Sequence, residues 1–233
     1  MAQRIGSLFA ILAVALLVLL APYLPASNET FPANTVYYIV LHHAASGAPG
    51  FVLPDAPVGA VGVAPARPSS TSPTPNAGRA GATPTIKRTK IVTPRGLSQD
   101  ITEHEIDVLH RARGFDEIGY NYVIRFDGTI EKGRAEDVRG AHARAWDSRG
   151  ISYNASSIAI CFAGNCDAAP WTKAQEASAY KLILELMRRY HVPPERVIGH
   201  RECGMDTDCP GTLIDMDKVR TKVRNLWLLT NGD

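Results

Sequence analysis

Apolar positions along this chain fall into short continuous runs and into longer segments with helical spacing. Val36–Leu41 (VYYIVL) and Ile158–Phe162 are unbroken runs of aliphatic, β-branched and aromatic residues, and Val197–Ile198 is a shorter one. Such runs are typical of strands that are buried on both faces. Gly119–Glu131 (GYNYVIRFDGTIE) has apolar residues on both sides of Asp127-Gly128, which predicts two strands joined by a turn.

Two segments have the spacing of amphipathic helices. Thr102–Arg113 and Thr172–Tyr190 both begin with Thr-x-x-Glu or Thr-x-x-Gln, the pattern of a capping box, followed by an apolar stripe. His110 lies on the stripe of the first helix, and we expect it to be a core histidine. Asp215 is predicted to cap a last helix that reaches about Leu229.

Residues 47–93 interrupt this pattern. Proline, alanine, glycine, serine and threonine fill most of these positions. A segment of this composition buries too little apolar area to offset the entropy lost on ordering. We interpret it as a flexible insertion, either a tolerated surface loop or a tether or lid near the site, since it begins beside His42.

Residues 1–30 form a separate unit. Arg4 is followed by the uncharged run Leu8–Ala21 and then by Pro22 and Pro25. This order predicts an export signal, either cleaved or retained as an anchor through residues 8–24. We therefore expect the protein in the periplasm or cell envelope, secreted or anchored to the inner membrane.

Charge and cysteine content narrow the range of functions. A net charge of +2 is too small for a nucleic-acid partner, which usually requires a basic surface. The four cysteines (Cys161, Cys166, Cys203 and Cys209) allow three pairings in an exported protein. Cys161, inside an apolar run, is expected to be a small core residue.

The candidate chemistry lies at the ends of predicted strands. His42 follows the first buried run, His200 follows Val197–Ile198, and Cys209 lies on the turn before Pro210-Gly211. Three ligands of these types with one open position are the arrangement of a catalytic zinc site. The alternative is a cysteine hydrolase in which Cys209 is the nucleophile and His200 or His42 the base.

Several motifs, in this order, resemble one family. LHHAAS, GYNYVIRFDGTI, GAHA, NASSIAICFAGN and VIGHREC…TDCPG are similar to the zinc-dependent N-acetylmuramoyl-L-alanine amidases of the phage lysozyme and peptidoglycan recognition protein type. The resemblance covers about Val36 to Leu229. It implies an α/β fold: a single amidase domain (31–229), interrupted by the insertion, with a central mixed β-sheet flanked by helices and a zinc-containing groove.

The resemblance also implies roles for individual residues. Zn²⁺ would be bound by His42, His200 and Cys209. Tyr120 and Thr207 would be catalytic, placed beside the metal and the scissile carbonyl.

Substrate contacts are the third group of roles that the resemblance implies. His43, His142 and Asn154 would contact the substrate.

Cys161 stands where related cytoplasmic enzymes have a glutamate, which points away from cell-wall recycling.

The implied reaction is hydrolysis of the amide bond between N-acetylmuramic acid and L-alanine in peptidoglycan, by a monomer. The other class of function that fits these residues is an exported peptidoglycan-binding protein without turnover. Retention of both Tyr120 and Cys209 favours the enzyme.

Overall fold

A mixed sheet of five strands forms the centre of the protein. The computed structural model describes residues 35–51 and 89–231. The strand order is β5-β4-β6-β1-β7, with β1 parallel to β6 and β7, β4 parallel to β6, and only the β4–β5 pair antiparallel. The strands are β1 (Tyr38–His43), β4 (Tyr122–Ile124), β5 (Ile130–Lys132), β6 (Ser157–Phe162) and β7 (Val197–Gly199).

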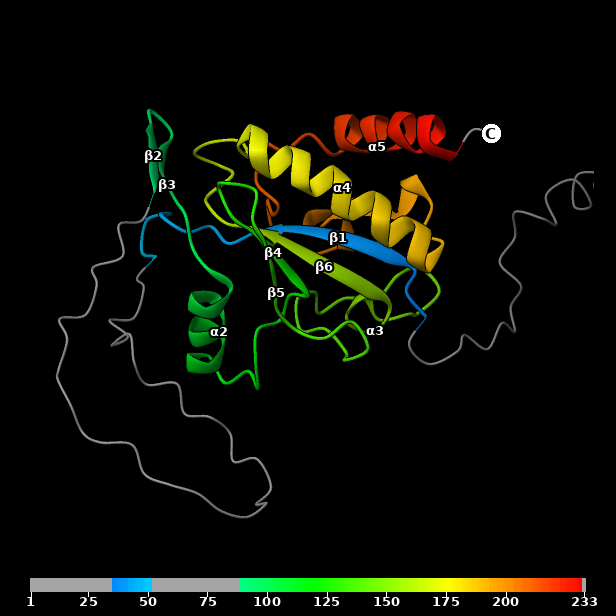
Figure 1. Cartoon of the computed structure of the whole chain (residues 1–233). Helices are drawn as coiled ribbons and strands as arrows, with labels where there is room; N and C mark the ends of the chain where they lie inside the picture. Colours follow the sequence, from blue (N-terminus) through cyan, green and yellow to red (C-terminus); the bar gives the residue numbers. More distant parts are fainter. Residues whose placement is uncertain (1–34, 52–88, 232–233) are drawn as a thin grey trace, which may run out of the picture. The chain divides into compact units, whose positions relative to one another are not determined.

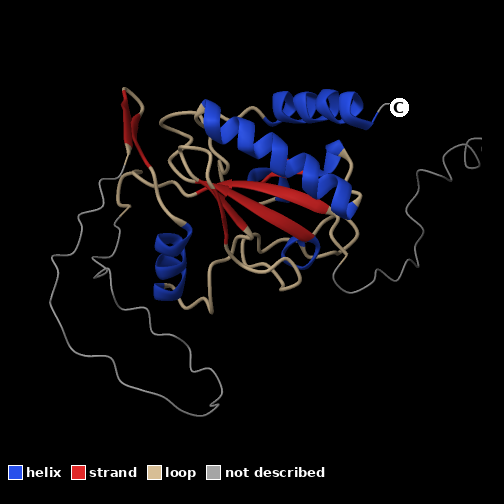
Figure 2. Ribbon diagram, viewed as in Figure 1, coloured by secondary structure: helices blue, strands red, loops and turns tan. Residues whose placement is uncertain are grey.

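Helices α4 (Lys173–Tyr190) and α5 (Met216–Asn231) pack on one face of this sheet (Figures 1 and 2). Ile39 and Leu41 of β1 and Ile183 and Leu186 of α4 belong to this largest core and are almost fully buried. Burial of such side chains contributes about 1.5–3 kcal/mol each. We call this the helix-covered face.

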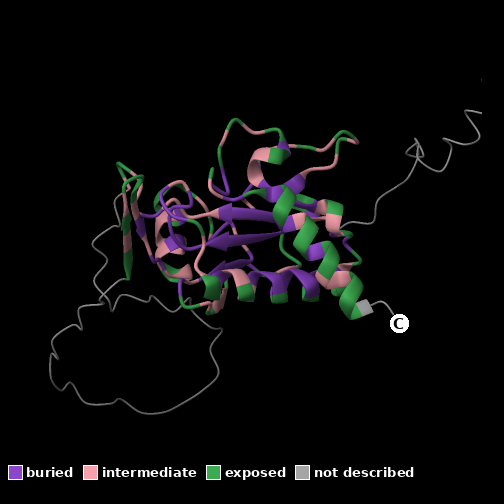
Figure 3. Cartoon of the chain, turned by 90° about the horizontal axis from the view of Figure 1, so that it is seen from above, coloured by how far each residue is buried: buried purple, intermediate pink, exposed green. Residues whose placement is uncertain are grey.

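The opposite face carries the residues of interest, and we call it the site face. Two smaller clusters pack on it: one includes α2 (Glu103–Ala112), and the other includes the loop that leads to the short helix α3 (Tyr153–Ser156). β6 is buried along its whole length and β1 at its four middle residues, and Figure 3 shows the centre of the sheet coloured as buried. Both sides of β1 are therefore enclosed, as its unbroken apolar run predicts.

The predicted helix starts are confirmed. Thr102 caps α2 and Thr172 caps α4, each with both hydrogen bonds of a capping box. His110 is buried and its Nδ1 accepts the Gly119 N–H at 2.9 Å, so it is the core histidine that was expected. Asp215 Oδ1 accepts the N–H groups of Asp217 and Lys218 at the start of α5.

The end of the predicted insertion differs from expectation. Lys90–Thr93 forms strand β2, which pairs in antiparallel fashion with β3 (Gly96–Gln99). Expecting the whole of 47–93 to lack structure was therefore wrong at its C-terminal end, because Ile91, Val92 and Thr93 suit a strand once Gly96 (φ +127°) closes the turn. Residues 52–88 lie outside the described residues, as does the predicted export signal.

Among the described residues, no helix combines the length and apolar character needed to cross a membrane.

Candidate metal centre

Strand β1 determines where its two histidines point. Successive side chains of a strand face opposite sides of the sheet. Val40 belongs to a cluster on the site face, and His42, two residues further, lies on that same face. His43 lies on the helix-covered face, where its Nδ1 accepts the N–H of Cys166 at 2.9 Å. Of the two, only His42 can reach the cluster described next.

His200 is brought beside His42 by the parallel pairing of β1 and β7. The register pairs Leu41 with Gly199, and the two imidazole centroids are 4.5 Å apart. Gly199 allows the Cys209-Pro210 turn to lie close to β7, because a Cβ at this position would be 2.7 Å from Cδ of Pro210. A larger residue at position 199 would push the Cys209-Pro210 turn away from the strand.

Cys209 is held in place by the residue that follows His200. The Arg201 N–H donates to the Cys209 carbonyl at 2.8 Å, and its guanidinium donates to the carbonyls of Asp208 and Gly211 at 3.0 and 2.9 Å. The Thr207 hydroxyl accepts the Cys209 N–H at 3.2 Å. One arginine thus links the two ends of the loop that carries His200 and Cys209.

His42, His200 and Cys209 form a group that could hold a metal ion. Their ligand atoms lie within 4.8 Å of one another, and Cys209 Sγ is 3.5 Å from His42 Nδ1. Nitrogen and sulfur held about 2.0 and 2.3 Å from one tetrahedral zinc would be roughly 3.5 Å apart. The donor set and this spacing fit zinc.

A second observation supports the fit. His200 Nε2 is buried and has no hydrogen-bond partner among the residues that the structure describes. Buried polar atoms are nearly always paired, so an orphaned nitrogen requires an explanation. A metal ion bound by His200 Nε2 would supply the missing partner.

Burial dominates the electrostatics of the three side chains. It lowers the pKa of His42 well below the usual value, with a further contribution from His142 and His200, and it lowers the pKa of His200. Both imidazoles are therefore neutral near pH 7, the form that binds metals. Burial also raises the pKa of the Cys209 thiol to about 12, against the opposing effects of the His43 backbone amide and Arg201.

Tyr120 lies next to the group. Its ring centroid is 4.9 Å from that of His42 and 5.3 Å from that of His110. Burial raises the pKa of its hydroxyl well above the usual value, and Cys161 and Cys209 add to the effect. Tyr120 is therefore protonated at neutral pH and can donate a hydrogen bond.

The remaining predicted site residues lie at different distances from this centre. His142 is in direct contact with it: His142 Nδ1 lies 3.0 Å from His42 Nε2. Asn154 is one step further away, since its Oδ1 accepts the N–H groups of His142 and Ala143 at 2.8 Å each. Their predicted contacts with substrate, and that of His43, stay predictions.

Two residues at this centre were missed by sequence reasoning. Arg201 fastens the ligand loop, and Ser157 Oγ lies 3.2 Å from His142 Nε2. Arg201 could have been suspected from its place directly after a ligand. Nothing in the sequence distinguishes Ser157 from Ser156 beside it.

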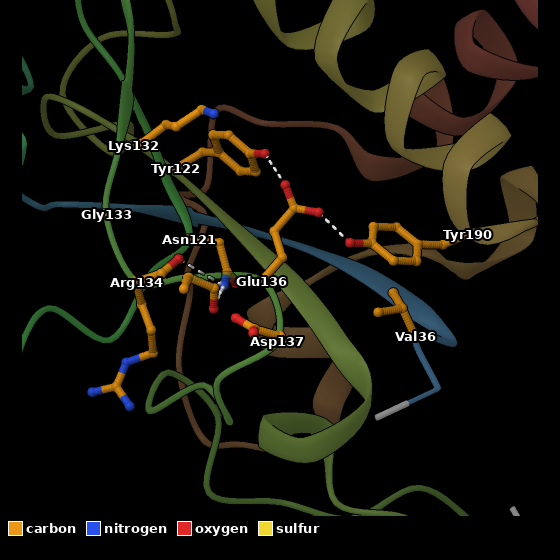
Figure 4. A pocket seen from close by; sticks show the side chains of 10 residues that line it. Val36, Asn121, Tyr122, Lys132, Gly133, Arg134, Glu136, Asp137 and Tyr190 are labelled. Atoms are coloured by element: carbon orange, nitrogen blue, oxygen red, sulfur yellow. Dashed lines mark hydrogen bonds between the residues drawn. The ribbon is translucent and has the colours of Figure 1, made fainter. Parts of the chain in front are cut away.

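The protein also has a pocket of about 510 Å³ away from these residues, lined mainly by residues of β4, β5 and the segment that follows β5 (Figure 4). Glu136 extends into it and accepts hydrogen bonds from the hydroxyls of Tyr122 and Tyr190, and Arg189 donates to it at 2.8 Å. The pocket's central carboxylate is thus paired within the protein. Its lining includes none of the residues of the metal centre.

An α/β domain with two histidines and a cysteine converging beside its central sheet is a candidate metalloprotein. Comparison with known proteins identifies the family. The model of the N-acetylmuramoyl-L-alanine amidase family (Amidase_2) matches residues 85–212. The chain belongs to this family. The match includes His200 and Cys209, while His42 precedes it and joins them only in the folded structure.

Individual relatives include peptidoglycan-recognition proteins and phage endolysins. Peptidoglycan-recognition protein SC2 of Drosophila melanogaster is 36% identical over 124 residues, 53% of this chain and 60% of that protein. The endolysin of Escherichia phage T7 is 35% identical over 98 residues, 40% of this chain and 60% of the endolysin. The chain thus spans about three fifths of the length of these relatives.

Among solved structures, N-acetylmuramoyl-L-alanine amidase LysC from Clostridium intestinale is 31% identical, with a TM-score of 0.47, over 53% of this chain and 76% of that one.

Proposed function

We propose that this protein is a zinc-dependent N-acetylmuramoyl-L-alanine amidase that hydrolyses the amide bond between N-acetylmuramic acid and L-alanine in peptidoglycan. Membership of the amidase family supports the reaction class. The observation that carries the metal dependence is the unpartnered, buried His200 Nε2 in one group with His42 and Cys209.

A zinc ion held by His42, His200 and Cys209 would lower the pKa of a water molecule to about 7 and polarise the scissile carbonyl. The protein's own groups supply the rest. The Tyr120 ring lies beside His42, and we expect its protonated hydroxyl to donate a hydrogen bond to the oxyanion that develops from the carbonyl. The Thr207 oxygen holds the Cys209 N–H, which leaves the hydroxyl proton of Thr207 available as a second donor.

A cysteine hydrolase accounts for the same residues less well. Cys209 and His42 are close enough to form a nucleophile–base pair. However, burial raises the pKa of the Cys209 thiol to about 12, which disfavours the thiolate that a nucleophile requires, whereas a coordinating metal ion would itself deprotonate the thiol. The cysteine mechanism also gives His200 Nε2 no partner, and zinc does.

The deciding experiment uses the full-length purified protein and mass spectrometry of digested peptidoglycan. We expect free stem peptides that begin at L-alanine. They should disappear with a chelator and return with added zinc.

Two other outcomes are informative. Activity that survives the chelator but is lost on thiol alkylation would establish the cysteine hydrolase. Intact peptidoglycan under every condition, with the folded protein retained on it, would establish a binding protein without turnover.

Export is the second part of the proposal, supported by the charge and hydropathy pattern of residues 1–30. We propose that the protein acts in the cell envelope, either cleaved after this segment or anchored through residues 8–24. Cell fractionation with sequencing of the mature N-terminus tests this. Recovery of the full-length chain in the cytosol would exclude it.

A further inference from the structure

A chain of hydrogen bonds leads from the metal centre to the protein backbone. His42 Nε2 lies 3.0 Å from His142 Nδ1, and His142 Nε2 lies 3.2 Å from Ser157 Oγ. Ser157 Oγ in turn donates to the Tyr153 carbonyl at 2.6 Å. His42, His142 and Ser157 are all buried, so water does not compete for these contacts.

The last bond determines the direction of the others. A carbonyl oxygen can only accept, and a serine hydroxyl has one proton to donate. Ser157 therefore donates to Tyr153 and accepts from His142 Nε2–H. A neutral imidazole has a single N–H, so His142 Nδ1 is an acceptor and must receive the proton of His42 Nε2. His42 Nδ1 is then left with its lone pair, and it is this atom that lies 3.5 Å from Cys209 Sγ.

We propose that His142 and Ser157 are positioning residues that hold His42 in the Nε2–H tautomer, so that its Nδ1 is presented to the metal. The proposal rests on the metal site of the proposed function. Metal-binding histidines usually donate their second N–H to a carboxylate, carbonyl or water. Here a second imidazole accepts it, without adding a negative charge to the site.

The surrounding backbone is built to hold the His142 ring. Asn154 Oδ1 accepts the N–H groups of His142 and Ala143, and the Asn154 carbonyl accepts the Gly140 N–H at 2.7 Å. A Cβ at position 140 would lie 2.7 Å from Cδ2 of the His142 ring, so only glycine leaves room for it. This accounts for the glycine two residues before the histidine in the GAHA motif.

Because both ring nitrogens of His142 have partners within the protein, the proposal gives this residue a different role from the substrate contact predicted from the sequence. If His142 positions His42 through hydrogen bonds, substitutions that keep these bonds should differ from substitutions that only fill the space. Phenylalanine at position 142 would fill the space without hydrogen bonds. Glutamine could accept with its oxygen and donate with its nitrogen, in the same direction as histidine.

The test compares His142→Phe, His142→Gln and Ser157→Ala with the unchanged protein. Two quantities are measured: zinc affinity by competition with a chelator, and the tautomer of His42 in the metal-free protein by ¹⁵N NMR of the imidazoles. Tyr38→Phe is the matched control. It removes a hydrogen bond to Asp147 in the neighbouring loop but leaves the hydrogen bonds from His42 to the Tyr153 carbonyl intact.

We expect zinc affinity to fall about 10- to 100-fold in His142→Phe, the usual effect of losing such a partner, and several-fold in Ser157→Ala. His142→Gln and Tyr38→Phe should stay within about threefold of the unchanged protein. His42 should be the Nε2–H tautomer in the unchanged protein and a mixture in His142→Phe.

Unchanged affinity and an unchanged His42 tautomer in both His142→Phe and Ser157→Ala would overturn the proposal. Should His142→Phe fail to fold, Ser157→Ala decides alone. The two readouts also separate this proposal from the proposed function. If the unchanged protein binds zinc but leaves peptidoglycan intact, the function fails while affinity and tautomer still decide the role of His142.

Discussion

The two faces of the central sheet are built from the same strands but follow different rules. On the helix-covered face, Leu41 belongs to an apolar cluster that includes side chains of α4 and α5. On the site face, one residue further along β1, His42 is equally buried but is surrounded by imidazoles, a thiol and a tyrosine ring. We conclude that the apolar packing of the helix-covered face supplies the stability with which the site face can keep polar side chains buried.

Removing a ligand on the site face should have the largest effect on function and little on the fold. We expect Cys209→Ala or His200→Ala to lose bound zinc and to reduce amidase activity by more than about 1,000-fold, because several kcal/mol of charge stabilisation is lost. Metal analysis and muropeptide assays measure this.

Cys203→Ala is the matched control for Cys209→Ala, since Cys203 is also buried on the site face but is not in the ligand group. Added zinc should raise the Tm of the unchanged protein and of Cys203→Ala, but not that of Cys209→Ala. A full equivalent of zinc in Cys209→Ala would contradict the ligand assignment.

Truncation on the helix-covered face should show the reverse. Ile183→Ala and Leu186→Ala in α4 remove fully buried side chains, and we expect each to lower the free energy of unfolding by about 2–5 kcal/mol. Urea unfolding of the metal-free protein measures the loss. The folded variants should still bind one zinc, and exposed Lys181→Ala should change neither quantity.

The pH dependence of stability should reveal a buried histidine of the site face. Burial, followed by Arg113, lowers the pKa of His110 to about 4 from 6.5. Between these values the unfolded chain binds more protons than the folded one, so stability falls as the pH drops from 6.5 towards 4. We expect the free energy of unfolding to fall more steeply with decreasing pH in the unchanged protein than in His110→Gln. Urea unfolding with chelator present measures this.

His42 and His142 titrate in both proteins and cancel from this comparison. Parallel pH profiles for the unchanged protein and His110→Gln would show that His110 does not contribute.

The smallest effects should come from the helix caps, which are alike on both faces. Thr102→Ala in α2 and Thr172→Ala in α4 each remove a capping box, at a cost of about 1 kcal/mol. Thr172→Ala should cost more, since its hydroxyl also donates to the Phe126 carbonyl at 2.6 Å. Urea unfolding checks the order, with the serine variants as controls. Equal losses would mean that this extra bond contributes nothing.

The elements of the fold were largely predictable because their signals are local. Capping boxes at Thr102 and Thr172, the Asp127-Gly128 turn and the apolar run of β6 each depend on a few neighbouring residues. β2 was missed because four residues inside a proline- and glycine-rich segment carry too weak a pattern without their partner strand.

By itself, the sequence determined the family, the α/β elements and the candidate ligands, because motif residues and hydrophobic periods are properties of the chain. Only the tertiary structure showed that His42 Nδ1 lies against Cys209 Sγ, that His43 points to the other face, and that His142 contacts His42. A strand buried on both faces has no polar alternation to mark which side is which. The direction of a side chain in β1 is decided by the helices, strands and loops that pack on it from distant parts of the chain.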